Sequence, residues 1–318
     1  MAINWFPGHM ATAKKEIRRA MPDVDFILEI LDARIPFSSE NPMVVALRGH
    51  KPCIKVLNKC DLADARVTEA WLAHLERIPG VKARAIQSNQ PSQARALLEL
   101  GRSLLPRDRT AHRKILVMVL GVPNVGKSTV INSLARRSIA KTGNKPAVTK
   151  AQQRIHNVGD FILLDTPGFL WPRLSPAACG YRLAVTGAVA DTVVDYQDIG
   201  EFAARFLLQS YPDALRARYN LDTLPDEPKA LLEAIAARRA CVARGGVVDF
   251  QKVSELLVRE LRQGLLGRLS MESPPEVAVV EAGLAEAGLA EAELGLGEAV
   301  GGEEGEDVEG DAPVEDPV

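Results

Sequence analysis

The chain has 318 residues, of which 47% are hydrophobic and 25% charged, so it is long enough to bury a core without disulfides or structural metals. Its formal net charge of −2 hides an asymmetry, because 15 of its 41 acidic residues, and no Lys or Arg, lie in 271–318. The preceding 270 residues hold 39 basic and 26 acidic side chains, a net charge of +13, which indicates a polyanionic partner.

Apolar runs of strand length follow one another through the first half of the chain. The predicted strands are 26–32, 53–58, 83–88, 115–121, 154–158 and 161–165. Several are continuously apolar, as expected of strands buried on both faces of a parallel sheet. Helical patterns accompany them at 10–21, 42–49, 67–78, 92–105 and 126–138. This alternation predicts an α/β domain over residues 1–172, with right-handed crossovers.

After about residue 172 the strand patterns stop, and helical periodicity broken by Pro or Gly continues. The helical segments are 175–189, 199–211, 213–219, 227–245 and 249–269. We therefore expect a second, all-helical and Arg-rich domain over 173–271. From 272 to 318, a repeated EAGLA and then GGEEGEDVEGD predict a disordered, acidic, low-complexity tail.

The sequence Gly121-Val-Pro-Asn-Val-Gly126-Lys127-Ser128 matches the phosphate-binding pattern G-x-x-x-x-G-K-[ST], between an apolar strand and a helical pattern. In that context, backbone N–H groups and the helix N-terminus converge on phosphate oxygens. We expect Lys127 to reach the β- and γ-phosphates and Ser128 to bind Mg²⁺. The positions expected to contact the nucleotide here are Asn124, Val125, Gly126, Lys127, Ser128 and Thr129.

A second phosphate motif, Asp165-Thr-Pro-Gly168, closes the strand 161–165. A carboxylate at this place can hold Mg²⁺ through water, and the Gly168 N–H can contact a γ-phosphate. Thr149 lies on a polar loop between the two motifs, where it is the candidate for a second hydroxyl on Mg²⁺. The alternative for Thr149 is a loop-capping role.

Asn58-Lys-Cys-Asp61 ends the strand 53–58 and indicates a guanine site. Asp61 can accept hydrogen bonds from guanine N1–H and N2–H₂, and leaving it unpaired beside adenine costs ~1–3 kcal/mol. We expect Asn58 to brace the neighbouring loops and the Lys59 stem to cover the base. Ser88 is expected to present backbone donors to the guanine O6. Combined with the phosphate motifs, this favours GTP over ATP.

The base motif precedes the phosphate motifs along the chain, which is an unusual order. A parallel sheet does not require one chain order, because termini that lie close together permit circular permutation. In this order, the loop after Gly168 leads directly into the helical domain. We therefore expect γ-phosphate contacts to order that loop and to reposition the helical domain.

The motif order, together with Trp5-Phe-Pro-Gly-His-Met10, Asp32-Ala-Arg34, G-V-P-N-V-G-K-S-T and D-T-P-G-F, resembles the circularly permuted ribosome biogenesis GTPase A (YlqF) family. The resemblance covers about residues 1–270, including Arg262-x-Gly264-x-x-Gly267-Arg268, and ends before the tail. It implies a GTPase with an RNA-binding helical domain that binds the precursor of the large ribosomal subunit. It also implies that GTP binding and hydrolysis are coupled to late 50S assembly, with stimulation by ribosomal particles.

Phe169 and Leu170 follow the D-T-P-G motif, where many GTPases have a Gln that orients water. Neither side chain can hydrogen-bond to water, so we expect slow intrinsic turnover. The resemblance favours His9 as the catalytic group, with a structural or rRNA-contacting role as the alternative. Asn124 resembles the Asn of potassium-activated GTPases and implies K⁺ as a second cation beside Mg²⁺. Its alternative role is to shape the loop.

Basic residues fall in three clusters, which favour folded rRNA over DNA as the partner. The clusters are Lys14, Lys15, Arg18, Arg19; Arg136, Arg137, Lys141, Lys145, Lys150; and Arg238, Arg239, Arg244, Arg259, Arg262, Arg268. The sequence has no RRM, KH or zinc-knuckle motif, so recognition by RNA shape is expected.

Two other classes of protein were weighed. One is an RNA-binding scaffold in which GTP is a structural ligand with little turnover. Lys127, Ser128, Thr149 and Asp165 favour an enzyme instead. The other is a signalling or membrane-linked GTPase, against which the lack of lipidation motifs counts.

The chain shows no signs of secretion, disulfide formation or metal binding through thiols. Its four cysteines form no C-x-x-C pair, its N-terminus lacks a signal peptide, and no apolar run approaches the ~20 residues that cross a bilayer. We expect a cytoplasmic protein without a membrane partner.

Overall fold

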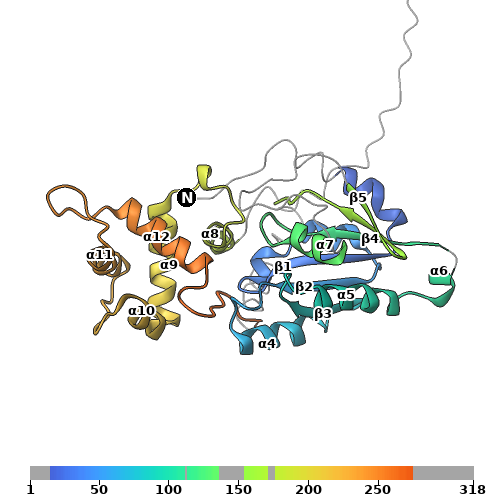
Figure 1. Cartoon of the computed structure of the whole chain (residues 1–318), viewed down its shortest axis with the longest axis horizontal. Helices are drawn as coiled ribbons and strands as arrows, with labels where there is room; N and C mark the ends of the chain where they lie inside the picture. Colours follow the sequence, from blue (N-terminus) through green and yellow to red (C-terminus); the bar gives the residue numbers. More distant parts are fainter. Residues whose placement is uncertain (1–14, 112, 136–153, 171–175, 275–318) are drawn as a thin grey trace, which may run out of the picture.

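The structure, a computed structural model, describes residues 15–111, 113–135, 154–170 and 176–274. In these ranges a six-stranded sheet with its helices forms one half of the molecule. Helices α8 to α12 lie together in the other half (Figure 1). The described strands all lie before residue 171, and α8 to α12 all lie after residue 175.

All six predicted strands are present. They are β1 Phe26–Asp32, β2 Cys53–Asn58, β3 Val81–Ile86, β4 Ile115–Leu120, β5 Arg154–Val158 and β6 Phe161–Asp165. β3 begins two residues earlier than expected, because Val81 pairs with Cys53 at the start of β2. β1 and β2 are buried along their whole length, as expected of central parallel strands, and the burial includes Glu29 of β1 and Lys55 of β2, whose charged groups lie 3.7 Å apart.

The strands lie in the order β3-β2-β1-β4-β6-β5. β1 pairs in parallel with both β2 and β4, and β4 pairs in parallel with β6. β5 is antiparallel to β6, so the sheet is mixed, and the parallel arrangement expected of several strands does not extend to this edge. The physical reason is the connection: only Gly159 and Asp160 separate the two strands, which permits a hairpin and no crossover.

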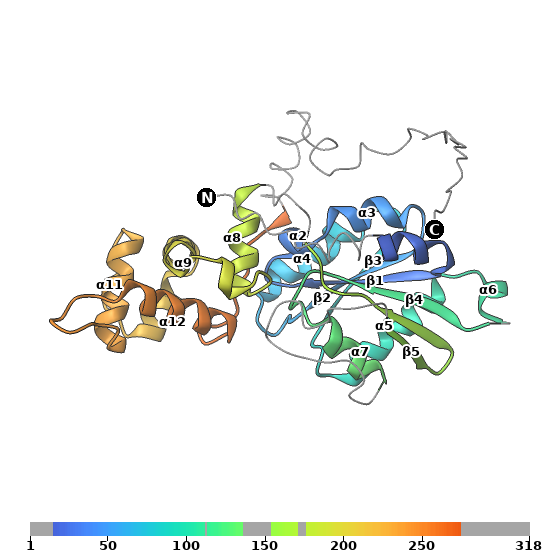
Figure 2. The ribbon, with the colours of Figure 1, turned by 90° about the horizontal axis from the view of Figure 1, so that it is seen from above.

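Helices cover both faces of the sheet. They are α2 Pro36–Ser39, α3 Pro42–Arg48, α4 Ala65–Leu75, α5 Pro91–Ser103, α6 Arg107–Ala111 and α7 Lys127–Ala135. Trp71 and Leu75 of α4 form a buried cluster with Leu31 and Leu57 on one face. On the other face α5 and α7 contact each other (Figure 2).

The second half consists of α8 Ala177–Thr186, α9 Tyr196–Ser210, α10 Pro212–Tyr219, α11 Pro228–Arg239 and α12 Phe250–Arg262. Helix α9 packs against both α11 and α12. Gly200 permits the close approach to α12, because a Cβ there would lie 2.4 Å from the Ser254 Cβ. None of the described helices combines the length and apolar character that a bilayer-spanning helix needs.

The chain returns to the sheet half after α12. Glu272, expected to be the first residue of the tail, is buried, and its carboxylate accepts hydrogen bonds from the backbone N–H groups of Phe37 and Ser38. Arg182 of α8 forms an ion pair with it at 3.3 Å. The boundary predicted at 272 is therefore too early, because these partners bring a charged residue into the folded body. Residues 275–318 lie outside the described residues.

Candidate nucleotide-binding site

The three nucleotide motifs meet at one edge of the sheet. Asn58 ends β2, the 121–128 loop follows β4, and Asp165 ends β6. These three strands run in the same direction as β1, which lies between β2 and β4. Ligands of open α/β sheets bind at the carboxyl ends of the strands, where these motifs lie.

The phosphate loop contacts the base motif directly. Asn58 Nδ2 donates a 2.7 Å hydrogen bond to the Val125 carbonyl. Gly126 has φ +97°, and a Cβ there would lie 2.3 Å from Asn58 Nδ2. Glycine is therefore required both by the left-handed backbone and by the approach of the two loops.

Lys127, the first residue of α7, is buried beneath this loop. Its Nζ donates to the carbonyls of Gly121 at 2.9 Å and Val122 at 2.8 Å. Burial lowers the pKa of Lys127 to about 8, although the nearby Asp165 carboxylate acts in the opposite direction. An ammonium has three protons, so a phosphate oxygen can be added to these two acceptors.

The D-T-P-G segment packs against the phosphate loop. The Thr166 hydroxyl donates a 2.8 Å hydrogen bond to the Val119 carbonyl in β4. A Cβ on Gly168 would lie 2.7 Å from Lys127 Nζ and 2.8 Å from the Pro123 Cα. The backbone after Asp165 therefore lies in direct contact with the residues that surround the phosphates.

The donor set present suits Mg²⁺. Asp165 is buried at the end of β6, close enough to Lys127 for an electrostatic effect, and Ser128 follows Lys127 directly. A hydroxyl, a carboxylate and water are hard oxygen ligands of the kind that Mg²⁺ prefers. Thr149, expected as a further ligand, and His9, expected as the catalytic group, lie outside the described residues.

Asn58 connects three loops. Its Oδ1 accepts a 3.1 Å hydrogen bond from the Ser88 N–H, and its backbone carbonyl accepts from the Ala33 N–H at 2.9 Å. The Ser88 N–H, expected to face guanine O6, is therefore directed to Asn58 instead. Asp61, expected to bind the guanine base, is exposed to solvent.

Asp32 adds a carboxylate that the sequence analysis gave no role. Lys59 Nζ donates to Asp32 Oδ2 at 2.9 Å, and Arg34 donates to both carboxylate oxygens, at 2.9 and 2.7 Å. Burial alone would raise the pKa of Asp32, but the charges of Arg34 and Lys59 hold it well below its usual range. The sequence does contain a signal for a role of Asp32 in the site, because Asp32 ends a mostly apolar strand and lies in register with Asn58.

The helical half contacts the phosphate loop. Asn124, at φ +59°, donates through Nδ2 to the carbonyl of Gly187, directly after α8, at 2.7 Å. Arg262 of α12 donates to the carbonyls of Ala184 and Val185 at 2.8 and 2.9 Å. Arg262 was grouped with RNA-facing residues, but here it holds the end of α8 beside the phosphate loop.

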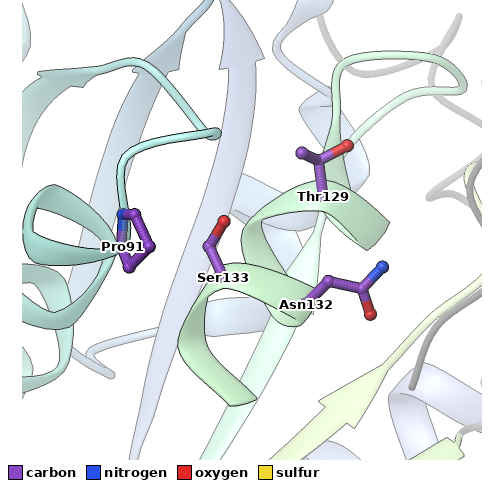
Figure 3. Close-up of a pocket in the computed structure, with 4 residues that line it drawn as sticks. All are labelled: Pro91, Thr129, Asn132 and Ser133. Carbon is purple, nitrogen blue, oxygen red and sulfur yellow. The ribbon is translucent and has the colours of Figure 1, made fainter. Parts of the chain in front are cut away.

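An open hollow of about 670 Å³ flanks the site (Figure 3). Thr129, Asn132 and Ser133 line it from α7, and Pro91 lines it from the start of α5. The Ser133 hydroxyl donates to the Ser88 carbonyl, which joins the lining of the hollow to the residue that also contacts Asn58.

Comparisons with known proteins identify relatives over most of the chain. A family model described as 50S ribosome-binding GTPase matches residues 116–206. Ribosome biogenesis GTPase A of Priestia megaterium is 43% identical over 284 residues, which cover 87% of this chain and 98% of that protein. Mitochondrial ribosome-associated GTPase 1 of Bos taurus is 32% identical over 292 residues, 84% and 88% of the two chains.

Two solved structures agree with the fold. A GDP-bound structure of YlqF has a TM-score of 0.60 at 25% identity and covers 81% of this chain and 99% of that one. GNP-bound YlqF from T. maritima has a TM-score of 0.58 at 26% identity, covering 83% and 98%.

Proposed function

The chain belongs to the ribosome biogenesis GTPase A family and hydrolyses GTP, and we propose that it binds the precursor of the large ribosomal subunit and its rRNA. In this proposal, GTP binding and hydrolysis are coupled to late 50S assembly, and ribosomal particles stimulate turnover. The family model's description, and the ribosome named for the bovine relative, support a ribosomal partner. A scaffold with GTP as an inert ligand is disfavoured, because the family is one of GTP hydrolases.

The observation that carries the nucleotide proposal is the hydrogen bond from Asn58 to the Val125 carbonyl. It joins the loop that carries Asp61 to the loop that carries Lys127. Guanine recognition and phosphate binding therefore belong to one rigid edge of the sheet. In this site, Asp61 accepts from guanine N1–H and N2–H₂ while Lys59 covers the base.

We further propose that the domain is a circularly permuted GTPase followed by a helical RNA-binding domain. The base motif at 58–61 precedes the family-model match, which begins at residue 116. The described elements from 177 to 262 are helical. The contact between Asn124 and Gly187 supplies a route by which the state of the phosphate loop reaches these helices.

For hydrolysis, Lys127 neutralises phosphate charge, and Ser128 and Asp165 would hold Mg²⁺, which would supply further positive charge to the phosphate oxygens. Phe169 and Leu170 are buried and apolar, so the residues directly after Gly168 cannot orient water. The proposal therefore assigns proton handling or water positioning to His9 and a second hydroxyl to Thr149.

A K⁺ ion bound through Asn124 is the further cation of the proposal. In the structure the Asn124 amide nitrogen donates to the Gly187 carbonyl, which fixes the orientation of the amide. GTP turnover is expected to be faster in K⁺ than in Na⁺. Equal turnover rates in the two salts would contradict a K⁺ site at Asn124.

The RNA surface is assigned to exposed basic residues of the helical half. These are Arg238, Arg244, Arg259 and Arg268. Arg239 and Arg262 of the same cluster are only partly exposed and donate to backbone carbonyls. Binding through such contacts weakens steeply with salt, because condensed counterions are released from the RNA.

Nucleotide-dependent co-sedimentation tests the proposal. The protein is expected to sediment with precursor large-subunit particles when bound to a non-hydrolysable GTP analogue, and to be released with GDP. A matched variant, Arg244→Gln with Arg259→Gln, should bind more weakly at every nucleotide state. Equal sedimentation with small-subunit particles would contradict the assigned partner.

A further inference from the structure

After α12 the chain forms what we name the C-terminal strap, residues 269–272. It leaves the helical half and lies along the sheet half, beside α2 (Figure 2). Every residue of the strap is buried. The strap is therefore part of the fold. It forms a second connection between the two halves, in addition to the segment of chain that precedes α8.

The first contacts of the strap are with residues 62–64, which directly follow Asp61 and which we name the guanine loop. The Leu269 N–H donates a 2.9 Å hydrogen bond to the Leu62 carbonyl. The Asp64 N–H donates to the Ser270 hydroxyl oxygen at 3.1 Å. Two consecutive strap residues thus hold the backbone on the C-terminal side of Asp61, while Asp32 holds Lys59 on its N-terminal side.

The helical half holds the strap through one hydroxyl group. Tyr211, between α9 and α10, accepts a 2.9 Å hydrogen bond from the Ser270 N–H. The same hydroxyl donates to the Ser270 carbonyl at 3.1 Å. Both backbone groups of Ser270 are therefore satisfied by a side chain of the helical half.

The far end of the strap is anchored on the sheet half. The Met271 N–H donates to the Arg34 carbonyl at 2.8 Å, and Trp71 Nε1 donates to the Glu272 carbonyl at 3.0 Å. The Glu272 carboxylate accepts from Phe37 and Ser38 and pairs with Arg182. A continuous series of hydrogen bonds therefore joins Tyr211 to Ser270 and Ser270 to the backbone at Asp64.

We propose that Tyr211 and Ser270 are positioning residues for guanine recognition, by which the helical half sets the affinity for guanine nucleotides. They hold the backbone at Leu62 and Asp64, and so fix where the neighbouring Asp61 carboxylate meets the base. This inference rests on the proposed guanine site.

The test uses the full chain with Tyr211→Phe and Ser270→Ala, each of which removes hydrogen-bonding capacity without adding bulk. Dissociation constants are measured for GDP and for inosine diphosphate, which lacks the N2 amino group. Each variant should lose roughly three- to tenfold in GDP affinity and less in inosine diphosphate affinity. A merely structural role would weaken both nucleotides equally.

Tyr181→Phe is the matched control, because Tyr181 stacks on Phe202 in the same half and forms no hydrogen bond to the strap among the described residues. It should leave both affinities unchanged, and circular dichroism should show all three variants folded. Unchanged or equally weakened binding of the two nucleotides in folded variants would overturn the role of the strap. If the wild-type protein itself fails to prefer GDP to inosine diphosphate, the guanine site fails instead.

Discussion

The ammonium of Lys59 lies 2.9 Å from the carboxylate of Asp32, which ends the neighbouring strand. Arg34 pairs with the same carboxylate, and both Asp32 and Arg34 are buried. One acidic residue thus compensates a buried guanidinium and orients the lysine of the base motif.

Asp32→Asn should therefore cost about 3–5 kcal/mol of unfolding free energy, because it leaves the buried Arg34 charge without its counter-ion. Urea unfolding measures this. Asp23→Asn, at an exposed position, is the control and should change stability by less than about 0.5 kcal/mol. If Asp32→Asn lowered the free energy of unfolding no more than Asp23→Asn does, the ion pair between Asp32 and Arg34 would not be needed for stability.

Gly168→Ala should weaken GTP and GDP binding at least tenfold. The added Cβ would meet Lys127 Nζ and the Pro123 backbone within 3 Å, so the phosphate loop must shift. Gly159→Ala is the control: it introduces strain at φ +57° in the β5–β6 turn but contacts nothing within 4 Å. Its nucleotide affinity should match that of the wild type, as measured with a fluorescent GDP analogue. Normal binding by Gly168→Ala would contradict the packing described.

The strands and the nucleotide motifs could be predicted because their signals are local. Apolar runs mark β2 and β6, and Asn58 and Asp165 stand where those two runs end. The antiparallel direction of β5 could not be predicted, because it depends on the Gly159-Asp160 turn, which the apolar pattern does not report.

Glu272 shows why other features could not be predicted. A glutamate beside an acidic, low-complexity segment reads as solvated, and only the fold brings it to Ser38 and Arg182. The contacts of Tyr211 with Ser270 span 59 residues and have no sequence signature. From the sequence alone, Arg262 would likewise be interpreted as a surface charge, because only the fold brings the carbonyls at the end of α8 beside it.

The ion pair between Arg218 and Glu260 should make stability depend on pH. Hydrogen bonds from Arg218 hold the pKa of Glu260 below its ordinary value of 4.5. The pair therefore stabilises the fold above about pH 4.5, and this contribution is lost as the pH falls through the lower folded-state pKa.

Glu260→Gln should accordingly lower the unfolding free energy by about 1–3 kcal/mol at pH 7, with a difference that shrinks toward acid pH. Glu233→Gln, at an exposed position, is the control and should be neutral throughout. Unfolding titrations at pH 7 and at pH 3.5 that gave the same difference would contradict this assignment.

Removing residues 275–318 should strengthen non-specific RNA binding at low salt. This segment carries 14 acidic residues and no Lys or Arg, so its removal changes the net charge from −2 to +12. The deletion starts after the strap, so it leaves Glu272 in place. Filter binding of a non-ribosomal RNA checks the effect, which should vanish at high salt. Unchanged low-salt affinity would exclude a shielding role for the tail.

The proposed function is that of a GTPase, apolar directly after Gly168, that acts on the large-subunit precursor. The most direct measurement is GTP turnover with and without precursor large-subunit particles, in wild type and His9→Ala. We expect slow turnover alone, strong stimulation by the particles, and loss of that stimulation in His9→Ala with GTP affinity unchanged. Turnover that the particles do not alter would show that the precursor is not the partner that activates this GTPase.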